Sequence, residues 1–300
     1  MMRRWNERKP LTMGQKDSIL GFVLILPVVL LIALVILYPI LYNIRLSFFD
    51  VALNPKKPDV FVGLDNYMRL LTDKEFYKVL ITTVLFVAVS VTLSTGIGLG
   101  VAILFNRQFP GRGIARSLIL LSYVTPMISL VYVWKYMFNA MYGVVNYILI
   151  DVLHLLETAP AWFDNIWFAF ASVVVFDTWR LFPYAFMMIL AALQAVDTSM
   201  YEAAEIDGAG AWGKFRYITL PEILPVVSSV ATLRMIWNFY KFDDIYLLTQ
   251  QLPVIGIYLY KTSFAANDFG SAAAITVVLF VIVMTLVFLM RKVVFRRNAA

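Results

Sequence analysis

Residues 202–215 read EAAEIDGAGAWGKF and contain Gly208, four further residues and then Gly213-Lys214. This is the spacing of a phosphate-binding loop, in which backbone N–H groups surround the phosphates and the lysine contacts them. That chemistry also needs a preceding β-strand and a Ser or Thr after the lysine to hold magnesium. Here Phe215 follows Lys214, and residues 198–207 have a helical composition. Nucleotide binding is therefore not expected at this site, and the stretch needs another explanation.

Other reactive side chains form no catalytic or metal-binding set. The chain has no cysteine, and His154 is its only histidine. No His-Glu-x-x-His pattern occurs, nor a pair of carboxylates with a base in an apolar pocket. We therefore expect no catalytic residues, no metal site and no cofactor bound by this chain. His154 could be a pH sensor or a ligand, or an ordinary polar residue at a membrane surface.

Ionisable residues inside apolar segments are the remaining candidates. Asp177 and Arg180 are three residues apart, so a helix would place them on one face. Arg234, Trp237 and Asn238 would share a face of a second helix. A charge at the bilayer centre costs roughly 2.5–3.5 kcal/mol on insertion scales. Such groups are therefore expected to face a cavity or a partner.

The elements that must position these residues are those of a membrane protein. Of the 300 residues, 61% are hydrophobic and 15% charged, whereas soluble domains have roughly 25% charged residues. The uncharged runs 18–44, 79–106 and 269–290 each exceed the roughly 20 residues that a membrane-spanning helix needs. The net charge of +6 comes from Lys and Arg that flank these runs, which is not the pattern of a nucleic-acid surface. An all-α, polytopic membrane protein is expected.

We predict one transmembrane domain over residues 1–300. Its six spans lie at about 18–46, 79–105, 117–138, 165–195, 223–248 and 270–291. The side with both termini holds most of the flanking Lys and Arg, for example Arg3, Arg4 and Lys292, which places both termini in the cytoplasm. On the other side, residues 139–165 are rich in aromatics and lack Lys and Arg. A short helix at about 143–156 is expected to lie along this outer interface.

Small residues and prolines predict details of the spans. Thr92, Gly96 and Gly100 recur every four residues, which favours close packing of two helices on that face. Four prolines each remove a backbone donor and are expected to kink the first, third and fourth spans: Pro27, Pro39, Pro126 and Pro183.

Residues 196–222 are expected to form a cytoplasmic protrusion between the fourth and fifth spans. Residues 201–206 favour helix, and Asp207-Gly208 interrupts it. Residues 211–219 are expected to form a second short helix that Pro221 stops. Two short helices with a glycine turn suit docking against a partner protein better than they suit chemistry.

The spacing in this loop resembles the EAA motif of ABC-importer permeases. The pattern is Glu-Ala-Ala, three residues, Gly, nine residues, Ile, one residue and Leu-Pro. In that family, such loops seat in a cleft of a separate ATPase subunit. The resemblance implies a coupling role for the following residues: Glu202, Ala203, Ala204, Asp207, Gly208, Ala209, Ile218, Leu220 and Pro221.

Further segments resemble the carbohydrate-uptake, maltose-type branch of the same family. They are FVGLDNY at 61–67, Leu-Gln at 193–194, Asp-Gly-Ala at 207–209 and FDDIYLLT at 242–249. The family usually continues with a glycine-rich turn and several more residues. Here QQLP at 250–253 leads almost directly to YLY at 258–260, so the outer loop at 250–257 is shortened.

The resemblance implies a six-span permease subunit of an ATP-driven importer in the bacterial cytoplasmic (inner) membrane. Its solute would be a sugar or a related polyhydroxy compound, whose identity the family leaves open. It also implies three kinds of partner: a second permease subunit, two ATPase subunits that bind ATP and magnesium, and an external solute-binding protein.

Two interpretations of the polar residues in spans four and five stay open. In the first, they line the solute pathway, with indole faces stacked on sugar rings: Asp177, Trp179, Arg180, Arg234, Trp237, Asn238 and Asp243. In the second, Asp177 pairs with Arg180 and both hold the subunit interface.

Other function classes fit less well. A secondary transporter driven by an ion gradient often has two related halves, and no internal repeat is evident. A membrane-embedded enzyme lacks its acid/base or metal set. A scaffold that only recruits an ATPase does not account for polar residues inside the spans.

Overall fold

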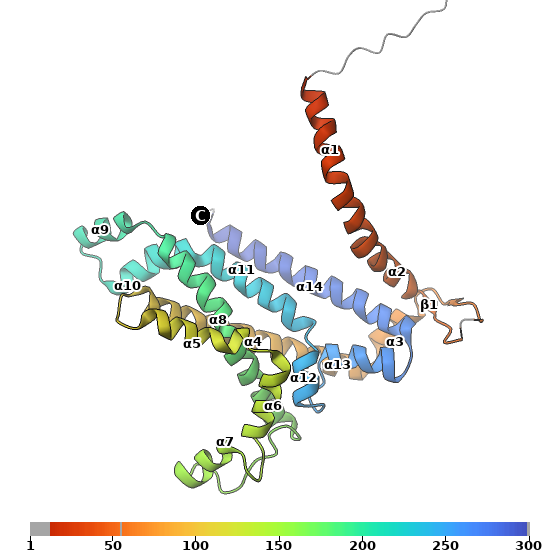
Figure 1. Cartoon of the computed structure of the whole chain (residues 1–300). Helices are drawn as coiled ribbons and strands as arrows, with labels where there is room; N and C mark the ends of the chain where they lie inside the picture. Colours follow the sequence, from red (N-terminus) through yellow and green to blue (C-terminus); the bar gives the residue numbers. More distant parts are fainter. Residues whose placement is uncertain (1–12, 55, 299–300) are drawn as a thin grey trace, which may run out of the picture.

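The computed structural model describes residues 13–54 and 56–298, and their fold is helical (Figure 1). Arg3 and Arg4, which contribute to the predicted orientation, lie outside the described residues. The helices are α1 Met13–Ile32, α2 Tyr38–Leu46, α3 Asp65–Thr72, α4 Lys74–Asn106, α5 Arg112–Val124, α6 Met127–Met137, α7 Val144–Asn146, α8 Ile166–Ala195, α9 Thr198–Ile206, α10 Ala211–Lys214, α11 Leu220–Phe239, α12 Asp243–Leu248, α13 Ile255–Tyr260 and α14 Phe269–Asn298. The π-helical turns are η1 Ala33–Leu37, η2 Tyr147–Val152, η3 Phe215–Thr219 and η4 Lys261–Ala265. The strands β1 Phe49–Asp50 and β2 Val60–Phe61 pair antiparallel.

Five helical segments in the described part of the chain are long and apolar enough to cross a membrane. They are Leu20–Leu46, Lys74–Asn106, Ile166–Ala195, Ala211–Phe239 and Phe269–Lys292. Helices α5 and α6 make a sixth only if the pair counts as one span, and they are bent by 93°. The kink expected at Pro126 in the span 117–138 is present, as a break between α5 and α6. Pro126 forces Thr125 into an extended conformation, which ends α5.

The expected fifth span, 223–248, is also interrupted. Helix α11 ends at Phe239, and residues 240–242 separate it from α12. Gly256 packs so closely against this break that an added Cβ would overlap the carbonyl oxygen of Lys241. The break lets α12 leave the axis of α11 and pack against α6.

The outer segment at 143–156 is helical over a shorter stretch than expected. Helix α7 and turn η2 cover residues 144–152, and no helix continues beyond them to 156. His154 follows with a left-handed backbone, φ 50°, and an exposed side chain.

Helices α4 and α8 form the closest long helix pair of the bundle. Ser94, Gly98 and Ala102 form a buried face of α4, and an added Cβ on Gly98 would lie 2.7 Å from the Cβ of Ala185 of α8. The face predicted to pack, with Thr92, Gly96 and Gly100, is largely exposed instead. Both faces repeat every four residues, so the pattern predicts close packing without indicating which face is covered.

Pro221 does not stop a helix, contrary to the prediction from the sequence. Helix α10, turn η3 and helix α11 follow one another without a break from Ala211 to Phe239. A proline removes a backbone donor and crowds the carbonyl one turn earlier. The wider π turn η3, in which Leu220 N–H donates to the Phe215 carbonyl, directly precedes this proline. Pro39 likewise follows the π turn η1. In both places a π turn directly before the proline allows the helix to continue through it.

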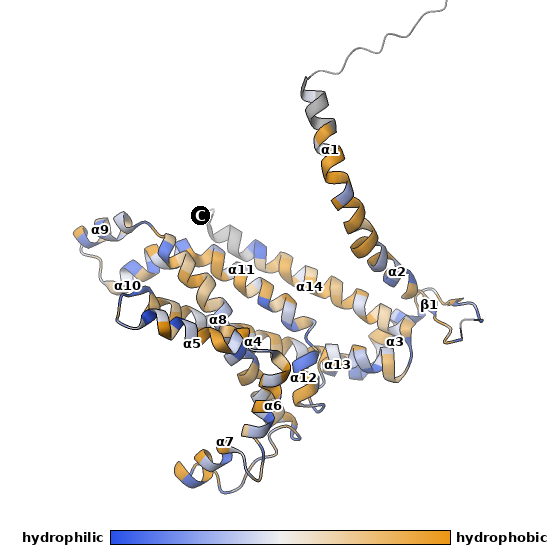
Figure 2. Ribbon diagram, viewed as in Figure 1, coloured by the Kyte–Doolittle hydropathy of each residue, from blue (hydrophilic) through white to orange (hydrophobic). Residues whose placement is uncertain are grey.

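The arrangement separates two ends of the bundle. Helices α9 and α10 lie at the end where α14 finishes, and α12, α13, α3 and β1 lie toward the other (Figure 1). The hydrophobic core joins residues of α4, α6, α8, α11, α12, α13 and α14. Helix α1 leaves this bundle, and the most apolar part of the first span is 0% buried (Figures 1 and 2).

Candidate functional site

A buried ion-pair network joins three helices in the middle of the bundle. Arg234 Nη2 of α11 lies 2.7 Å from Asp177 Oδ2 of α8, and neither side chain is exposed. Arg234 also donates to Asn238 Oδ1 at 3.1 Å and to Ser94 Oγ of α4 at 3.3 Å. Asn238 Nδ2 donates to the same Asp177 oxygen at 3.2 Å. Lys241 Nζ binds the other oxygen, Asp177 Oδ1.

Local structure brings these groups together. Arg234 and Asn238 are four residues apart, so they lie one above the other on the same face of α11. Lys241 lies in the break after α11 and can therefore turn its side chain back to Asp177. Ser94 of α4 supplies a further acceptor for the guanidinium. A buried carboxylate is stable only when charged and hydrogen-bonding partners replace its water, and Asp177 has such partners on both oxygens.

A second acidic residue extends the network. Lys241 Nζ lies 2.9 Å from Asp244 Oδ2 of α12, and Arg180 Nη1 of α8 lies 4.0 Å from the same oxygen. Arg180 Nε is buried without a hydrogen-bond partner among the described residues. Three cations therefore face two carboxylates, and Arg180 keeps donor capacity that its protein neighbours do not use.

A cavity of about 460 Å³ opens beside this network. Its walls are Met127, Arg180, Leu181, Arg234, Trp237, Asn238, Tyr240, Lys241, Phe242, Asp243 and Asp244. The ring of Trp237 is 44% exposed, and its centroid lies 5.2 Å from that of Tyr184. The cavity thus combines an accessible indole with fixed charged groups. We call it the inner cavity.

The structure brings together most of the residues predicted to line a pathway. Arg180, Arg234, Trp237, Asn238 and Asp243 line the inner cavity.

Two of the predicted residues lie outside its walls. Asp177 lies behind Arg234 and Asn238, and the Trp179 ring lies 5.6 Å from the Trp134 ring of α6. The alternative in which Asp177 pairs with Arg180 is wrong, because Asp177 pairs with Arg234 and Lys241.

Ser94, Lys241 and Asp244 were not among the site residues predicted from the sequence. The signal for Lys241 and Asp244 was present, because both are charges in an apolar stretch that must be compensated. No comparable signal existed for Ser94, a small polar residue among several on α4.

The loop between α8 and α11 is a second candidate site. Gly208 has a left-handed backbone, φ 76°, and turns the chain from α9 toward α10. Asp197 caps α9 by accepting from Ser199 N at 2.9 Å, and this bond lowers the pKa of the Asp197 carboxyl. Glu205 at the end of α9 pairs with Lys214 of α10, and the hydrogen bond from Lys214 lowers the pKa of the Glu205 carboxyl. We call the turn between α9 and α10 the elbow. Its shape depends on the left-handed Gly208 and on the Glu205–Lys214 ion pair.

The same loop presents apolar side chains to its surroundings. Ile206 is 87% exposed, Trp212 73% and Tyr217 81%. Glu202 and Ala203 are exposed as well, and Ala204, Ala209, Ile218 and Leu220 are half-buried. Tyr201 and Thr219 join the two arms through a 2.9 Å contact between their hydroxyl oxygens. Exposed large apolar residues on a fixed protrusion are typical of a protein-docking surface.

Comparison with known proteins decides the family. Residues 94–299 match the binding-protein-dependent transport system inner membrane component. The chain belongs to this family. It is accordingly a multi-pass transport protein of the inner membrane, and the match includes the loop, the network and the inner cavity.

Relatives in this family match almost the whole chain. The inner membrane ABC transporter permease protein YcjO of Escherichia coli (strain K12) is 53% identical over 279 residues, covering 93% of this chain and 95% of the relative. The trehalose/maltose transport system permease protein MalF of Thermococcus litoralis is 36% identical over 290 residues, covering 94% and 96%. A solved bacterial ABC transporter that imports the acidic polysaccharide alginate has the same fold. Its TM-score is 0.77 at 18% identity, covering 94% of this chain and 96% of the other.

Proposed function

We propose that this chain is the membrane-spanning permease subunit of an ATP-driven importer for a sugar or a related polyhydroxy solute. The observation that carries the proposal is the full-length similarity to a permease named for trehalose and maltose. Relatives named for trehalose in Mycobacterium tuberculosis and for lactose in Rhizobium radiobacter support the same substrate class.

The proposed topology has six spans with both termini in the cytoplasm. In it, α5 and α6 cross as one bent span, and the loop with α9 and α10 faces the cytoplasm. The excess of Lys and Arg near the ends of the chain supports this orientation. The appearance of α9, α10 and the end of α14 at one end of the bundle is consistent with it (Figure 1).

Coupling to ATP hydrolysis is proposed to occur through the elbow. The exposed side chains of Ile206, Trp212 and Tyr217 would fill an apolar cleft on a separate ATPase subunit, which would bind ATP and magnesium. Gly208 and the Glu205–Lys214 pair would keep the two short arms in a fixed relation. A rigid elbow can transmit a movement of the ATPase to α8 and α11, which it connects.

The other proposed partners are a second permease, a second ATPase and an external solute-binding protein. The exposed first span offers a helix-sized apolar surface, which a second permease subunit would cover. A structure of the alginate transporter in complex with a periplasmic protein supports the binding-protein partner by analogy.

The inner cavity is proposed to be this subunit's part of the solute pathway. Trp237 offers a ring face for a sugar, while Arg180 offers donors for hydroxyl groups. The network around Asp177 would hold those groups in place rather than contact the solute.

Two measurements test the proposed function. Purification of the chain from its native membrane in mild detergent should recover an ATPase and a second permease, identified by mass spectrometry. The recovered complex, with its binding protein, should then import labelled maltose, trehalose or lactose into proteoliposomes only when ATP is supplied. Uptake by this chain alone, driven by a proton or sodium gradient, would replace the proposal with a secondary transporter.

A further inference from the structure

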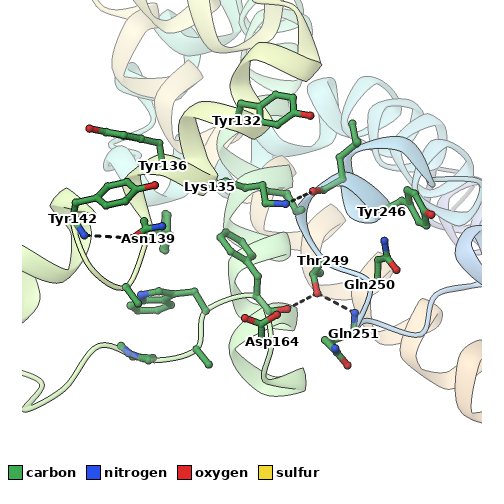
Figure 3. Close-up of a pocket in the computed structure, with 18 residues that line it drawn as sticks. Tyr132, Lys135, Tyr136, Asn139, Tyr142, Asp164, Tyr246, Thr249, Gln250 and Gln251 are labelled. Atoms are coloured by element: carbon green, nitrogen blue, oxygen red, sulfur yellow. Dashed lines mark hydrogen bonds between the residues drawn. The ribbon is translucent and has the colours of Figure 1, made fainter.

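A larger cavity lies on the other side of α12. Its volume is about 940 Å³, and three segments of the chain line it: residues 132–142 at the end of α6, residues 160–164 before α8, and residues 246–251 at the end of α12 (Figure 3). All three lie on the side of the bundle away from the α9–α10 elbow (Figure 1). We call this the outer cavity.

Aromatic and amide side chains meet in the outer cavity. Figure 3 shows Tyr136, Tyr142 and Asn139 on one side and Gln250 and Gln251 on the other. The tyrosine rings are accessible, at 65% for Tyr136 and 60% for Tyr142, and their centroids lie 5.0 Å apart.

Hydrogen bonds between distant parts of the chain fix the walls. Lys135 Nζ donates to the Leu247 carbonyl at 3.0 Å and so ties α6 to α12. Thr249 Oγ1 donates to the Phe163 carbonyl at 2.6 Å and ties the end of α12 to the segment before α8. These two hydrogen bonds hold the walls of the cavity in place without a ligand.

Several polar side chains that line the outer cavity have no hydrogen-bond partner among the described residues. The side chains of Gln250, Gln251 and Asp164 make no hydrogen bond or ion pair among the described residues, and all three are exposed. The hydroxyl of Tyr136 is likewise without a protein partner among those residues. Free amide and carboxylate groups beside accessible rings match a ligand with apolar C–H faces and many hydroxyls.

The aromatic belt of a membrane protein does not account for this arrangement. Tyr147 and Trp167, at 60% and 80% exposure, are accessible aromatics of the same region, but neither lines the cavity. The cavity rings instead converge with polar side chains on one concave surface. A volume of about 940 Å³ falls within the roughly 300–1,000 Å³ typical of small-molecule sites.

One short helix separates the two cavities. Tyr246, Leu247 and Leu248 of α12 line the outer cavity, and Asp243 and Asp244 at the start of the same helix line the inner one. A solute in the outer cavity is thus a single helix away from the network that holds Lys241 and Asp244 together.

We propose that the outer cavity is a carbohydrate-binding site in which one disaccharide-sized solute rests before it passes α12. The tyrosine rings stack on sugar faces, and Gln250, Gln251 and Asp164 bind hydroxyls. This inference rests on the proposed importer function, because it assumes that the solute arrives from this side.

The lack of cysteine in this chain allows a direct test. Ala161 is exposed and lines the outer cavity, whereas Ala266 is exposed in another outer connection and does not line it. Ala161→Cys and Ala266→Cys are introduced separately into the assembled complex, without binding protein, and alkylation of this chain by a maleimide is followed by mass. The probe is whichever of maltose, trehalose and lactose the same preparation imports.

At about ten times its Kd, the sugar should slow alkylation of Ala161→Cys about tenfold and leave Ala266→Cys unchanged. Adding Tyr136→Ala and Gln251→Ala should abolish the protection, while adding Tyr147→Ala should not. Active import without sugar protection at any concentration would overturn the outer site and leave the importer intact. Protection by the empty binding protein but not by sugar would also overturn it and identify a protein contact. Uptake by this chain alone, driven by a proton or sodium gradient and not by ATP, would reject the proposed function, and the outer site with it.

Discussion

Arg234 Nη2 and Asp177 Oδ2 lie 2.7 Å apart with both side chains fully buried, although 57 residues separate them in the chain. Their pairing connects α11 to α8, while Lys241 occupies the second oxygen of the same carboxylate. Removing one member of a buried pair costs far more than replacing both, because the survivor keeps an uncompensated charge.

Asp177→Leu should therefore destabilise the protein by about 3–5 kcal/mol, because Arg234 would lose its one carboxylate partner among the described residues. The double variant Arg234→Met with Asp177→Leu should recover much of that loss, because Lys241 retains Asp244 as a partner. Thermal unfolding in detergent provides the comparison. A double variant as unstable as the sum of the single ones would contradict this account of the pair.

Gly208→Leu should uncouple ATP hydrolysis from transport while the membrane domain stays folded. Its φ of 76° lies in the left-handed region, where a side chain costs roughly 1–2 kcal/mol. Gly210→Leu is the matched control, because Gly210 has φ −72° and open space around it. The ratio of solute imported to ATP hydrolysed should fall only in the first variant. An unchanged ratio for Gly208→Leu would exclude a role for the elbow's shape.

Trp237→Ala should reduce uptake at least about tenfold without affecting assembly, because it removes the exposed ring of the inner cavity. Arg180→Ala should have a similar effect through the loss of unused donors. Trp167→Ala, which removes an exposed indole outside both cavities, is the control. Normal transport in both inner-cavity variants would show that the solute does not contact this cavity.

The Glu205–Lys214 pair should make the elbow sensitive to acid. Lys214 lowers the pKa of the Glu205 carboxyl, so the pair stabilises the elbow above the usual carboxyl pKa of about 4.3 and loses this effect as pH falls through the lowered value. Hydrogen exchange of residues 205–214 should be slower in the wild type than in Glu205→Gln at pH 7. The difference should vanish once Glu205 is protonated. A difference that persisted in strong acid would mean that the carboxylate is not responsible.

The sequence predicted the family and the two-armed loop between α8 and α11 because the motif in 202–221 depends on local residue types at fixed spacing. It failed where a local pattern permits several tertiary outcomes. Asp177 and Arg180 share a helical face, but the break after α11 brings Lys241 to Asp177 instead. Likewise, Pro221 predicts a helix end, but the helix continues because a π turn precedes the proline, and the sequence does not indicate this turn. The outer cavity had no sequence signature, because its three segments meet only in the fold.

The pairing of Asp177 with Arg234 has a consequence for biogenesis. The apolar 18-residue stretch within Ala211–Phe239 has a mean hydropathy of 1.2, the lowest of the five candidate spans in the described chain. An arginine inside such a segment opposes its release from the translocon into lipid. The segment with Asp177 is synthesised first, so its retention beside the translocon until Arg234 arrives would let the two helices enter the bilayer as a neutralised pair. Membrane integration of α8 and α11 is then a joint event rather than two successive ones.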